Sequence, residues 1–130
     1  MPGNGTNCPL CDAEDRVLIS NALAFATRDA APVSPGHTLV VPRRHCESPF
    51  ELTRDEVVAC FDLLRDVRNE LMNAVRPPDG YNVGVNVGAA GGQGVPHVHI
   101  HLIPRYRGDV LEPRGGIRNI LPFRHYDHRG

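Results

Sequence analysis

The chain has 130 residues, 41% of them hydrophobic, and a formal net charge of −1 at pH 7. This length suits one domain with a genuine core, and the balanced charge excludes wholesale binding to nucleic acid or to a membrane surface. No stretch approaches the roughly 20 apolar residues of a membrane span. The first residues do not combine a basic segment with an apolar run, so we expect no signal peptide and a cytoplasmic location.

Short apolar runs separated by turn residues occupy the first third of the chain. Residues 16–27 predict two short strands around a turn at Ser20-Asn21. Residues 29–36 contain two prolines and predict a loop. Residues 37–41 predict a further strand, which Pro42 ends. These runs predict a small sheet that precedes the first long helix.

Residues 53–75 form the one clear amphipathic helix of the sequence. Thr53 and Glu56 have the spacing of a capping box, and Pro77-Pro78 ends the helix. Apolar residues recur three and four positions apart and predict one buried stripe: Val57, Cys60, Phe61, Leu64, Val67, Leu71 and Val75. We expect this helix to be a scaffold without chemistry of its own.

A second alternating segment, residues 81–87, predicts a strand with Asn82, Gly84 and Asn86 on one face. The glycine-rich residues 88–94 then join this strand to the next one. Because they do not open a helix, they form neither a P-loop nor a dinucleotide fingerprint. Such a loop can present N–H groups to phosphate, or it can be a flexible connection.

Three histidines alternate with three aliphatic residues in residues 97–102. On a β-strand this pattern places the imidazoles on one face, roughly 6.5–7 Å apart, and the aliphatic side chains on the other. Histidine can serve as a nucleophile, a general acid or base, or a metal ligand. The three side chains are too spread to reach one ion at about 2.0–2.1 Å. The run therefore predicts a catalytic face rather than a purely metal-binding one.

The chain contains four cysteines, and in a cytoplasmic protein a disulfide framework is not expected. Cys60 falls in the predicted helix as a core residue, and Cys46 lacks metal spacing to the other cysteines. The C-x-x-C pair, Cys8 and Cys11, could form a tetrahedral zinc site with two distant histidines. The alternatives are a redox pair or two reduced surface thiols.

The chain divides into a domain at residues 1–105 and an arginine-rich extension at residues 106–130. From Arg105 to Arg129 there are six arginines and three acidic residues. The extension is either a solvated tail or a segment that packs on the same domain or on a partner subunit. In the second case its guanidinium groups could reach phosphate. We expect His125 and His128 in this tail to be exposed.

These motifs together resemble the histidine triad (HIT) family. The matching segments extend from about Cys8 to Arg105, and they are Asp29, Pro35–His45, Asn86-Val87-Gly88, Gly92-Gln93 and the triad run His97–Ile103. The resemblance implies an α+β fold, a five-stranded antiparallel sheet with one long helix and a short one packed on it. It also implies a homodimer in which the sheet continues from one subunit to the other.

The resemblance further implies chemistry at the α-phosphorus of AMP-containing substrates. His99 corresponds to the nucleophile, which forms a covalent nucleotidyl-histidine that water then hydrolyses. His101 corresponds to a contact for the α-phosphate or the leaving group, and His37 joins the same cluster as a catalytic residue. The implied nucleotide contacts are Asp29, Asn86, Gly92, Gln93, His99 and His101. Gly94 stands where relatives often carry serine, which removes one hydroxyl donor beside the leaving group.

Zinc-containing relatives use a cysteine pair with two histidines, which are His45 and His97 in this sequence. The resemblance therefore implies a structural Zn²⁺ held by Cys8, Cys11, His45 and His97. In that case His97 holds metal while His99 and His101 perform the chemistry.

The leading functional hypothesis is a nucleotide hydrolase acting on dinucleoside polyphosphates or adenosine phosphoramidates. His101 favours hydrolysis, because related transferases commonly carry glutamine at its position. The alternatives are a nucleotidyltransferase or phosphorylase of the same superfamily, a purine-nucleotide-binding regulatory protein with incidental hydrolysis, and a metal-storage module. The leaving group and the base preference stay open. The expected partners are a purine nucleotide and a second copy of the chain, without nucleic acid or membrane.

Overall fold

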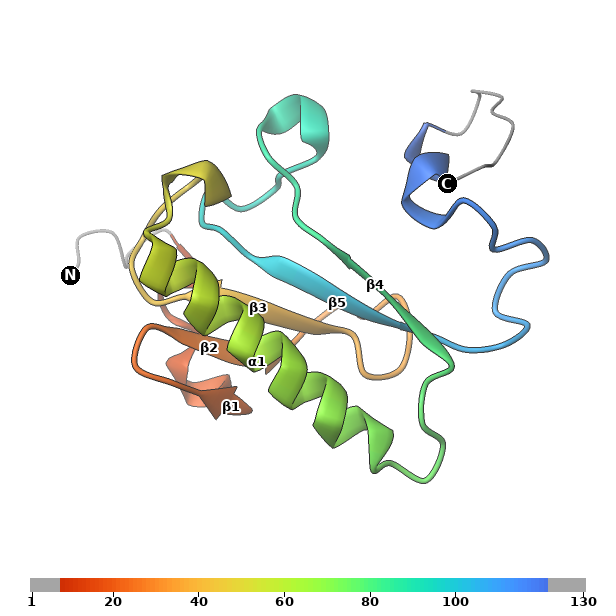
Figure 1. Ribbon diagram of the computed structural model, residues 1–130. Coiled ribbons are helices and arrows are strands. Elements are labelled where there is room, and N and C mark those ends of the chain that lie inside the picture. Colours follow the sequence, from red (N-terminus) through yellow and green to blue (C-terminus); the bar gives the residue numbers. More distant parts are fainter. Residues whose placement is uncertain (1–7, 122–130) are drawn as a thin grey trace.

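The computed structural model describes residues 8–121, in which a five-stranded antiparallel sheet carries one long helix across one face (Figure 1). The strands and the helix are β1 (Ile19–Ser20), β2 (Ala24–Arg28), β3 (Thr38–Pro42), α1 (Arg54–Met72), β4 (Gly80–Gly84) and β5 (Ile100–Arg105). Their order in the sheet is β1-β2-β3-β5-β4. The last strand in sequence therefore lies inside the sheet, and β4 forms one edge. The predicted fold class is confirmed.

The second, short helix that the resemblance implied is not an α-helix within residues 8–121. The remaining helical segments of this part are 3₁₀ turns of three to five residues: η2 (Ala13–Arg16), η3 (Pro49–Glu51), η4 (Ala89–Gly91) and η5 (Gly116–Ile120). No helix in the described residues has the length and apolar character needed to cross a lipid bilayer.

Helix α1 begins as predicted and ends three residues early. The hydroxyl of Thr53 accepts from the Glu56 N–H at 3.1 Å, and the Glu56 carboxylate accepts from the Thr53 N–H at 2.8 Å. This is the predicted capping box. The helix stops at Met72, so Val75 lies beyond it and is fully exposed.

The buried stripe of α1 is only partly the predicted one. The residues of the helix packed in the core are Ala59, Cys60, Leu63, Leu64, Val67 and Leu71. The prediction was wrong for Val57 and Phe61, whose exposed fractions are 40% and 57%. Both side chains flank the stripe and line an apolar hollow beside Val83 of β4. Helical period alone does not fix the width of the face that the sheet covers.

The two faces of the sheet have different partners. Alternate residues of β2, β3 and β5, among them Ala26, Val40 and Leu102, pack under α1. On the opposite face, Phe25 and Val41 pack with the amino-terminal segment around Cys8 and Leu10. Full burial of each large aliphatic side chain contributes about 1.5–3 kcal/mol. This second cluster therefore attaches the C-x-x-C segment to the face that α1 does not cover.

Strand β5 begins later than the histidine pattern predicted. Its first residue is Ile100, opposite Val40 of β3, and Leu39 lies opposite His101. His97 and His99 therefore precede the strand. Alternation within β5 is as predicted, because Ile100 and Leu102 are buried against the helix side while His101 is half-buried on the other side.

The described part of the extension returns to the domain through its first residues, and Gly116 also lies close to the Asn82 side chain of β4. The Tyr106 hydroxyl donates to the Pro35 carbonyl at 2.8 Å, and the Arg107 N–H donates to the Asp79 carboxylate at 2.8 Å. The side chain of Arg107 is 89% exposed. The tail histidines His125 and His128 lie outside the described residues.

Candidate active site and metal centre

The histidine run is divided between two side-chain clusters. His97 lies with Cys8, Cys11 and His45, while His101 lies with His37 and Asp29. His99 stands between them, its ring centroid 5.2 Å from that of His101. The run therefore spans two sites rather than presenting one uniform face.

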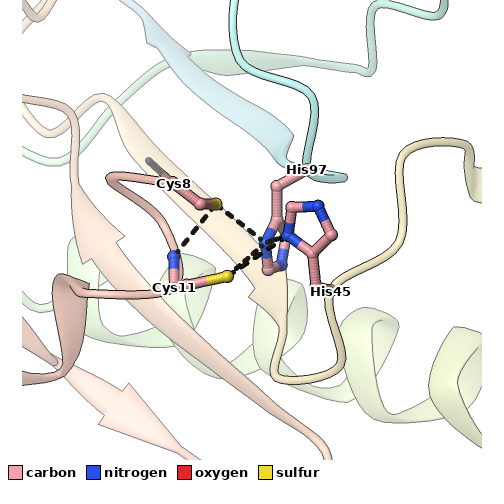
Figure 2. Close-up of side chains that lie close together, drawn as sticks. All are labelled: Cys8, Cys11, His45 and His97. Carbon is pink, nitrogen blue, oxygen red and sulfur yellow. Dashed lines mark hydrogen bonds between the residues drawn. The ribbon is translucent and has the colours of Figure 1, made fainter. Parts of the chain in front are cut away.

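The first cluster joins three distant segments (Figure 2). Its donor atoms all lie within 4.8 Å of one another: the sulfur atoms of Cys8 and Cys11 and the Nδ1 atoms of His45 and His97. His97 Nδ1 is 3.3 Å from Cys8 Sγ and 3.4 Å from Cys11 Sγ. His45 Nδ1 is 3.2 Å from both Cys11 Sγ and His97 Nδ1. These four donor atoms enclose a common point.

The hydrogen bonds of His97 fix the position of its ring proton. Its Nε2 lies 2.8 Å from the carbonyl oxygen of Pro42, and a carbonyl oxygen can only accept. Nε2 therefore carries the hydrogen, and the lone pair of Nδ1 is directed at the sulfur atoms and at His45. Burial lowers the pKa of His97, which favours this neutral form.

The four residues fit a tetrahedral metal ion. Bonds of about 2.3 Å to sulfur and 2.0–2.1 Å to nitrogen place neighbouring ligands of a tetrahedron roughly 3.3–3.8 Å apart. Four of the six pairs are 3.2–3.4 Å apart, at the short end of this range, and all six lie within 4.8 Å. The backbone N–H of Cys11 also donates to Cys8 Sγ at 3.3 Å, which fixes the position of this sulfur beside that of Cys11. A Cys2His2 set with its two thiolates suits zinc.

The second cluster is a chain of hydrogen bonds. The backbone N–H of Val33 donates to His37 Nδ1 at 3.1 Å, so the ring proton of His37 is on Nε2. His37 Nε2 lies 2.9 Å from His101 Nδ1 and donates to it. His101 consequently carries its own hydrogen on Nε2. This atom is therefore left as a hydrogen-bond donor.

Asp29 completes the second cluster as a nearby negative charge. Its Oδ2 is 3.4 Å from His37 Nε2 and 4.0 Å from His101 Nδ1, and its Oδ1 accepts from the Ala31 N–H. Burial lowers the pKa of both imidazoles, and the Asp29 carboxylate opposes this effect. Although these three residue types can bind metal, His37 Nε2 is occupied by a proton. The geometry therefore favours proton-bearing donors over a second metal site.

His99 has a hydrogen-bond arrangement opposite to that of His101. Its Nδ1 lies 2.8 Å from the carbonyl oxygen of His97, so Nδ1 carries the hydrogen and donates it. The lone pair is then on Nε2. A half-buried imidazole with a free Nε2 is the form required for a nucleophile.

Among the other predicted contacts, Gln93 uses its amide to tie the loop to the backbone around it. Its Oε1 accepts from the Gly88 N–H at 2.9 Å, and its Nε2 donates to the carbonyls of Glu47 and Val95. Asn86 and Gly92 are exposed on the same loop, and Gly92 has a φ of +92°. The loop is thus shaped by Gln93, and its role toward a nucleotide stays a prediction.

Sequence reasoning missed the backbone groups that set the imidazole tautomers. These groups are the Val33 N–H, the Pro42 carbonyl and the His97 carbonyl. Every residue carries such groups, so side-chain patterns contain no signal for them. Sequence reasoning also missed the ion pair between Arg44 and the buried Glu56, which ties the segment before His45 to α1.

The sequence model of one protein family, the HIT domain, matches residues 11–108. This range includes every residue of both clusters except Cys8. The chain belongs to the HIT family. The extension contributes only its first residues to this match.

Three HIT relatives carry three different activity names. The AP-4-A phosphorylase of Mycobacterium tuberculosis is 36% identical over 102 residues, covering 78% of this chain and 52% of the relative. The asymmetrical bis(5'-nucleosyl)-tetraphosphatase of Schizosaccharomyces pombe is 35% identical, with coverages of 75% and 53%. The adenosine 5'-monophosphoramidase hnt1 of the same yeast is 42% identical, with coverages of 68% and 62%. The chain spans about half the length of the first two relatives.

Solved structures of HIT proteins share the fold. A HIT family protein from Bacillus anthracis matches with a TM-score of 0.72 at 32% identity, covering 82% of each chain. A zinc-bound histidine triad family protein from Mycobacterium smegmatis matches with a TM-score of 0.73 at 25% identity, covering 82% of this chain and 80% of that one.

Proposed function

We propose that this HIT protein is a hydrolase that cleaves AMP-containing substrates at the α-phosphorus through a nucleotidyl-histidine intermediate. The hydrogen bond from His99 Nδ1 to the His97 carbonyl is the observation that carries the proposal, because it leaves Nε2 as a nucleophile. The relatives named as a tetraphosphatase and a monophosphoramidase support nucleotide processing. Neither name decides the reaction of this chain.

The first step is attack by His99 Nε2 on the α-phosphorus. A phosphorus–nitrogen bond forms while the bond from phosphorus to the leaving group breaks, and the leaving group takes the bonding electron pair. His101 Nε2–H donates a hydrogen bond to an oxygen that gains charge, and His37 holds His101 in the tautomer that can do so. Positioning and charge stabilisation of this kind dominate catalysis of phosphoryl transfer.

The second step is hydrolysis of the intermediate. Water attacks the same phosphorus and loses one proton to solvent, the phosphorus–nitrogen bond breaks, and AMP is released as His99 regains its lone pair. Division of one displacement into two lowers the barrier of each. Asp29 lies beside the His37–His101 pair and at the start of the loop after β2, where it can also accept from the ribose hydroxyls of AMP. Asn86, Gly92 and the loop that Gln93 shapes are proposed to contact the nucleotide.

We assign a structural Zn²⁺ to Cys8, Cys11, His45 and His97. The donor set and its spacing support this assignment, as does the zinc-bound relative. When bound, zinc supplies a rigid link between the amino-terminal segment and the segment that enters β5. All four cysteines are free thiols, and a reducing cytoplasmic location, which we also infer, keeps them available as ligands.

We infer a homodimer through the free edge of β4. Edge strands offer unpaired backbone groups, and here the edge adjoins exposed apolar side chains, namely Val57, Phe61 and Val83. Light scattering of the wild type should give twice the chain mass. Phe61→Glu should give the monomer mass, while Val75→Glu, which introduces the same charge beyond the helix end, should leave the dimer intact. A monomeric wild type would reject the inference.

A phosphorylase is the second candidate, favoured by the relative of that name. In that reaction inorganic phosphate replaces water in the second step and the product is ADP. His101 supports hydrolysis instead. Reaction in the presence of phosphate distinguishes the two, because only a phosphorylase converts the adenylyl group to ADP.

The deciding experiment measures products and intact mass after incubation with an adenosine phosphoramidate and with a dinucleoside polyphosphate. Wild type should release AMP and carry a trappable adenylyl adduct. His99→Ala should lose turnover by about 10⁴-fold or more and still bind AMP. Asn119→Ala, a substitution in the extension, serves as the folded control. No AMP from either substrate, with AMP still bound, would reject the hydrolase in favour of a nucleotide-binding regulatory protein.

A further inference from the structure

The β2–β3 loop, residues 29–36, supplies the group that orients the second cluster. Its Val33 N–H donates to His37 Nδ1, and this bond places the ring proton of His37 on Nε2, facing His101. Most residues of the loop are exposed. The loop and Ile103 of β5 also line a hollow of about 430 Å³. Because this space is open, packing alone does not hold the Val33 N–H beside His37.

Two side-chain hydrogen bonds tie the β2–β3 loop to the carboxyl end of β5, beside which it lies in Figure 1. The Ser34 hydroxyl donates to the Pro104 carbonyl at 2.8 Å. The Tyr106 hydroxyl donates to the Pro35 carbonyl at 2.8 Å. Since β5 also carries His101, these bonds fix the loop relative to the strand that completes the cluster.

Tyr106 is itself held in a closed turn. Its backbone N–H donates to the Asp109 carboxylate at 3.1 Å, and its carbonyl accepts from the Asp109 N–H at 2.9 Å. Arg105 makes two further hydrogen bonds to the same carboxylate. The Arg76 guanidinium lies 5.0 Å from the centroid of the Tyr106 ring. The side chain is therefore ordered by its own surroundings, so little conformational entropy opposes its bond to Pro35.

We propose that Tyr106 and Ser34 are positioning residues for the proposed reaction, acting through the backbone of the β2–β3 loop. Their hydroxyl groups hold the Val33 N–H in place, and this group keeps the imidazole pair in the tautomers that leave a proton on His101 Nε2. The proposal rests on the proposed function, in which that proton stabilises an oxygen that gains charge. It gives the first residue of the extension a role in the site that needs no contact with substrate.

The physical reason is that a neutral imidazole has two tautomers, and its neighbours select between them. If the Val33 N–H moves away, His37 can place its hydrogen on Nδ1. Its Nε2 then accepts from His101 Nδ1, and His101 Nε2 has a lone pair in place of its proton. The Asp29 carboxylate, 3.4 Å from His37 Nε2, still favours a proton there. Loss of the two hydroxyl groups therefore gives a mixture of tautomers rather than a complete reversal.

The test compares wild type with Tyr106→Phe/Ser34→Ala, using Tyr81→Phe as the matched control. Tyr81→Phe also removes one phenolic hydroxyl, but that hydroxyl donates to Met72 Sδ at the end of α1, at 3.2 Å. Long-range ¹H–¹⁵N NMR of histidine-labelled protein assigns the tautomer of each ring. Amide hydrogen exchange measures how firmly the Val33 N–H is held. Steady-state AMP release gives kcat and KM for the same samples.

We expect His37 and His101 to be single Nε2–H tautomers in wild type and in the control, and mixtures in the double variant. The Val33 amide should exchange faster in the double variant. His99 should stay Nδ1–H throughout, because its partner is the His97 carbonyl. As the reactive tautomer is lost, kcat should fall in proportion, by about 3–10-fold, the shift that one net hydrogen bond produces in an equilibrium. KM should change less than about twofold, since no proposed substrate contact is altered.

The proposal is overturned if the folded double variant keeps His37 and His101 as single Nε2–H tautomers, or if its kcat equals that of the control. The native His99 signal reports that the variant is folded. If that signal is lost, Tyr106→Phe alone is held to the same criterion. If wild type releases no AMP, the proposed function fails and the NMR comparison alone decides the positioning claim: a tautomer mixture supports it, and single tautomers overturn it.

Discussion

His97 and His101 are four residues apart in one run, yet their surroundings assign them different chemistry. His97 donates to a carbonyl through Nε2 and directs a lone pair at two thiols, whereas His101 accepts from His37 and retains an N–H. Around His97 Nδ1, four ligand atoms with lone pairs converge, and this arrangement suits a cation. The second already contains its protons and suits hydrogen bonding to substrate. Both rings carry hydrogen on Nε2, so the comparison teaches that the groups facing Nδ1, rather than motif position, separate metal binding from proton-bearing roles.

The largest expected effect is a loss of AMP release, without loss of zinc, when the second cluster alone is changed. His101→Ala removes the Nε2–H donor and should reduce AMP release by roughly 10²–10⁴-fold. Zinc content and melting temperature should stay close to those of wild type, since no ligand changes. Kinetics and metal analysis of one preparation check this. A loss of zinc in this variant would mean that the two clusters are not separate sites.

A substitution in the other cluster tests the metal centre alone. His45→Asn removes one ligand that is not in the run, so zinc affinity should fall by at least about 10-fold and the melting temperature by on the order of 10 °C. Calorimetry with and without added zinc measures both. Equal melting temperatures for wild type and variant at low free zinc would contradict a structural metal site.

A smaller effect concerns the charge beside the second cluster. The Asp29 carboxylate raises the pKa of His37 and His101 against the lowering effect of burial. Asp29→Asn should therefore lower both pKa values further below about 6.5, the ordinary value. NMR titration of the ring nitrogens measures the change, and unchanged values would remove Asp29 from the cluster.

The lowered pKa values of His37 and His101 also make the stability of the fold depend on pH. A buried imidazole with a lowered pKa binds its proton at a lower pH than the same imidazole does in the unfolded chain. Stability linked to His37 and His101 is therefore present above about pH 6.5 and declines as the pH falls below that value.

The smallest effect tests the tie between α1 and the segment that carries His45. Hydrogen bonds from Arg44 lower the pKa of Glu56 to about 2, from an ordinary 4.5. The resulting stability is complete above pH 4.5 and is lost as the pH falls toward 2. Glu56→Gln keeps the capping-box acceptor and should cost roughly 1–2 kcal/mol at neutral pH. Urea unfolding at several pH values should show the difference narrowing below pH 4.5, whereas a constant difference would exclude the ion pair as its cause.

Much of the fold was predictable because it follows from local rules. Alternation placed Ile100 and Leu102 under the helix, and the Thr53–Glu56 spacing located the start of α1. The late start of β5 was not predictable, because His97 leaves the strand to bond the Pro42 carbonyl. The exposure of Phe61 depends on how far the sheet extends beside α1, which the helical period does not contain. The roles of the site residues remain predictions.

The sequence by itself determined which chemical groups are available: two thiols in C-x-x-C spacing, a run of alternating histidines, and a glycine-rich loop before them. Side-chain type and spacing are local properties of the chain, so they can be read without a fold. Only the tertiary structure decided which nitrogen of each histidine carries a proton. That choice depends on the Val33 N–H and on the carbonyls of Pro42 and His97, whose positions relative to each ring are set by folding.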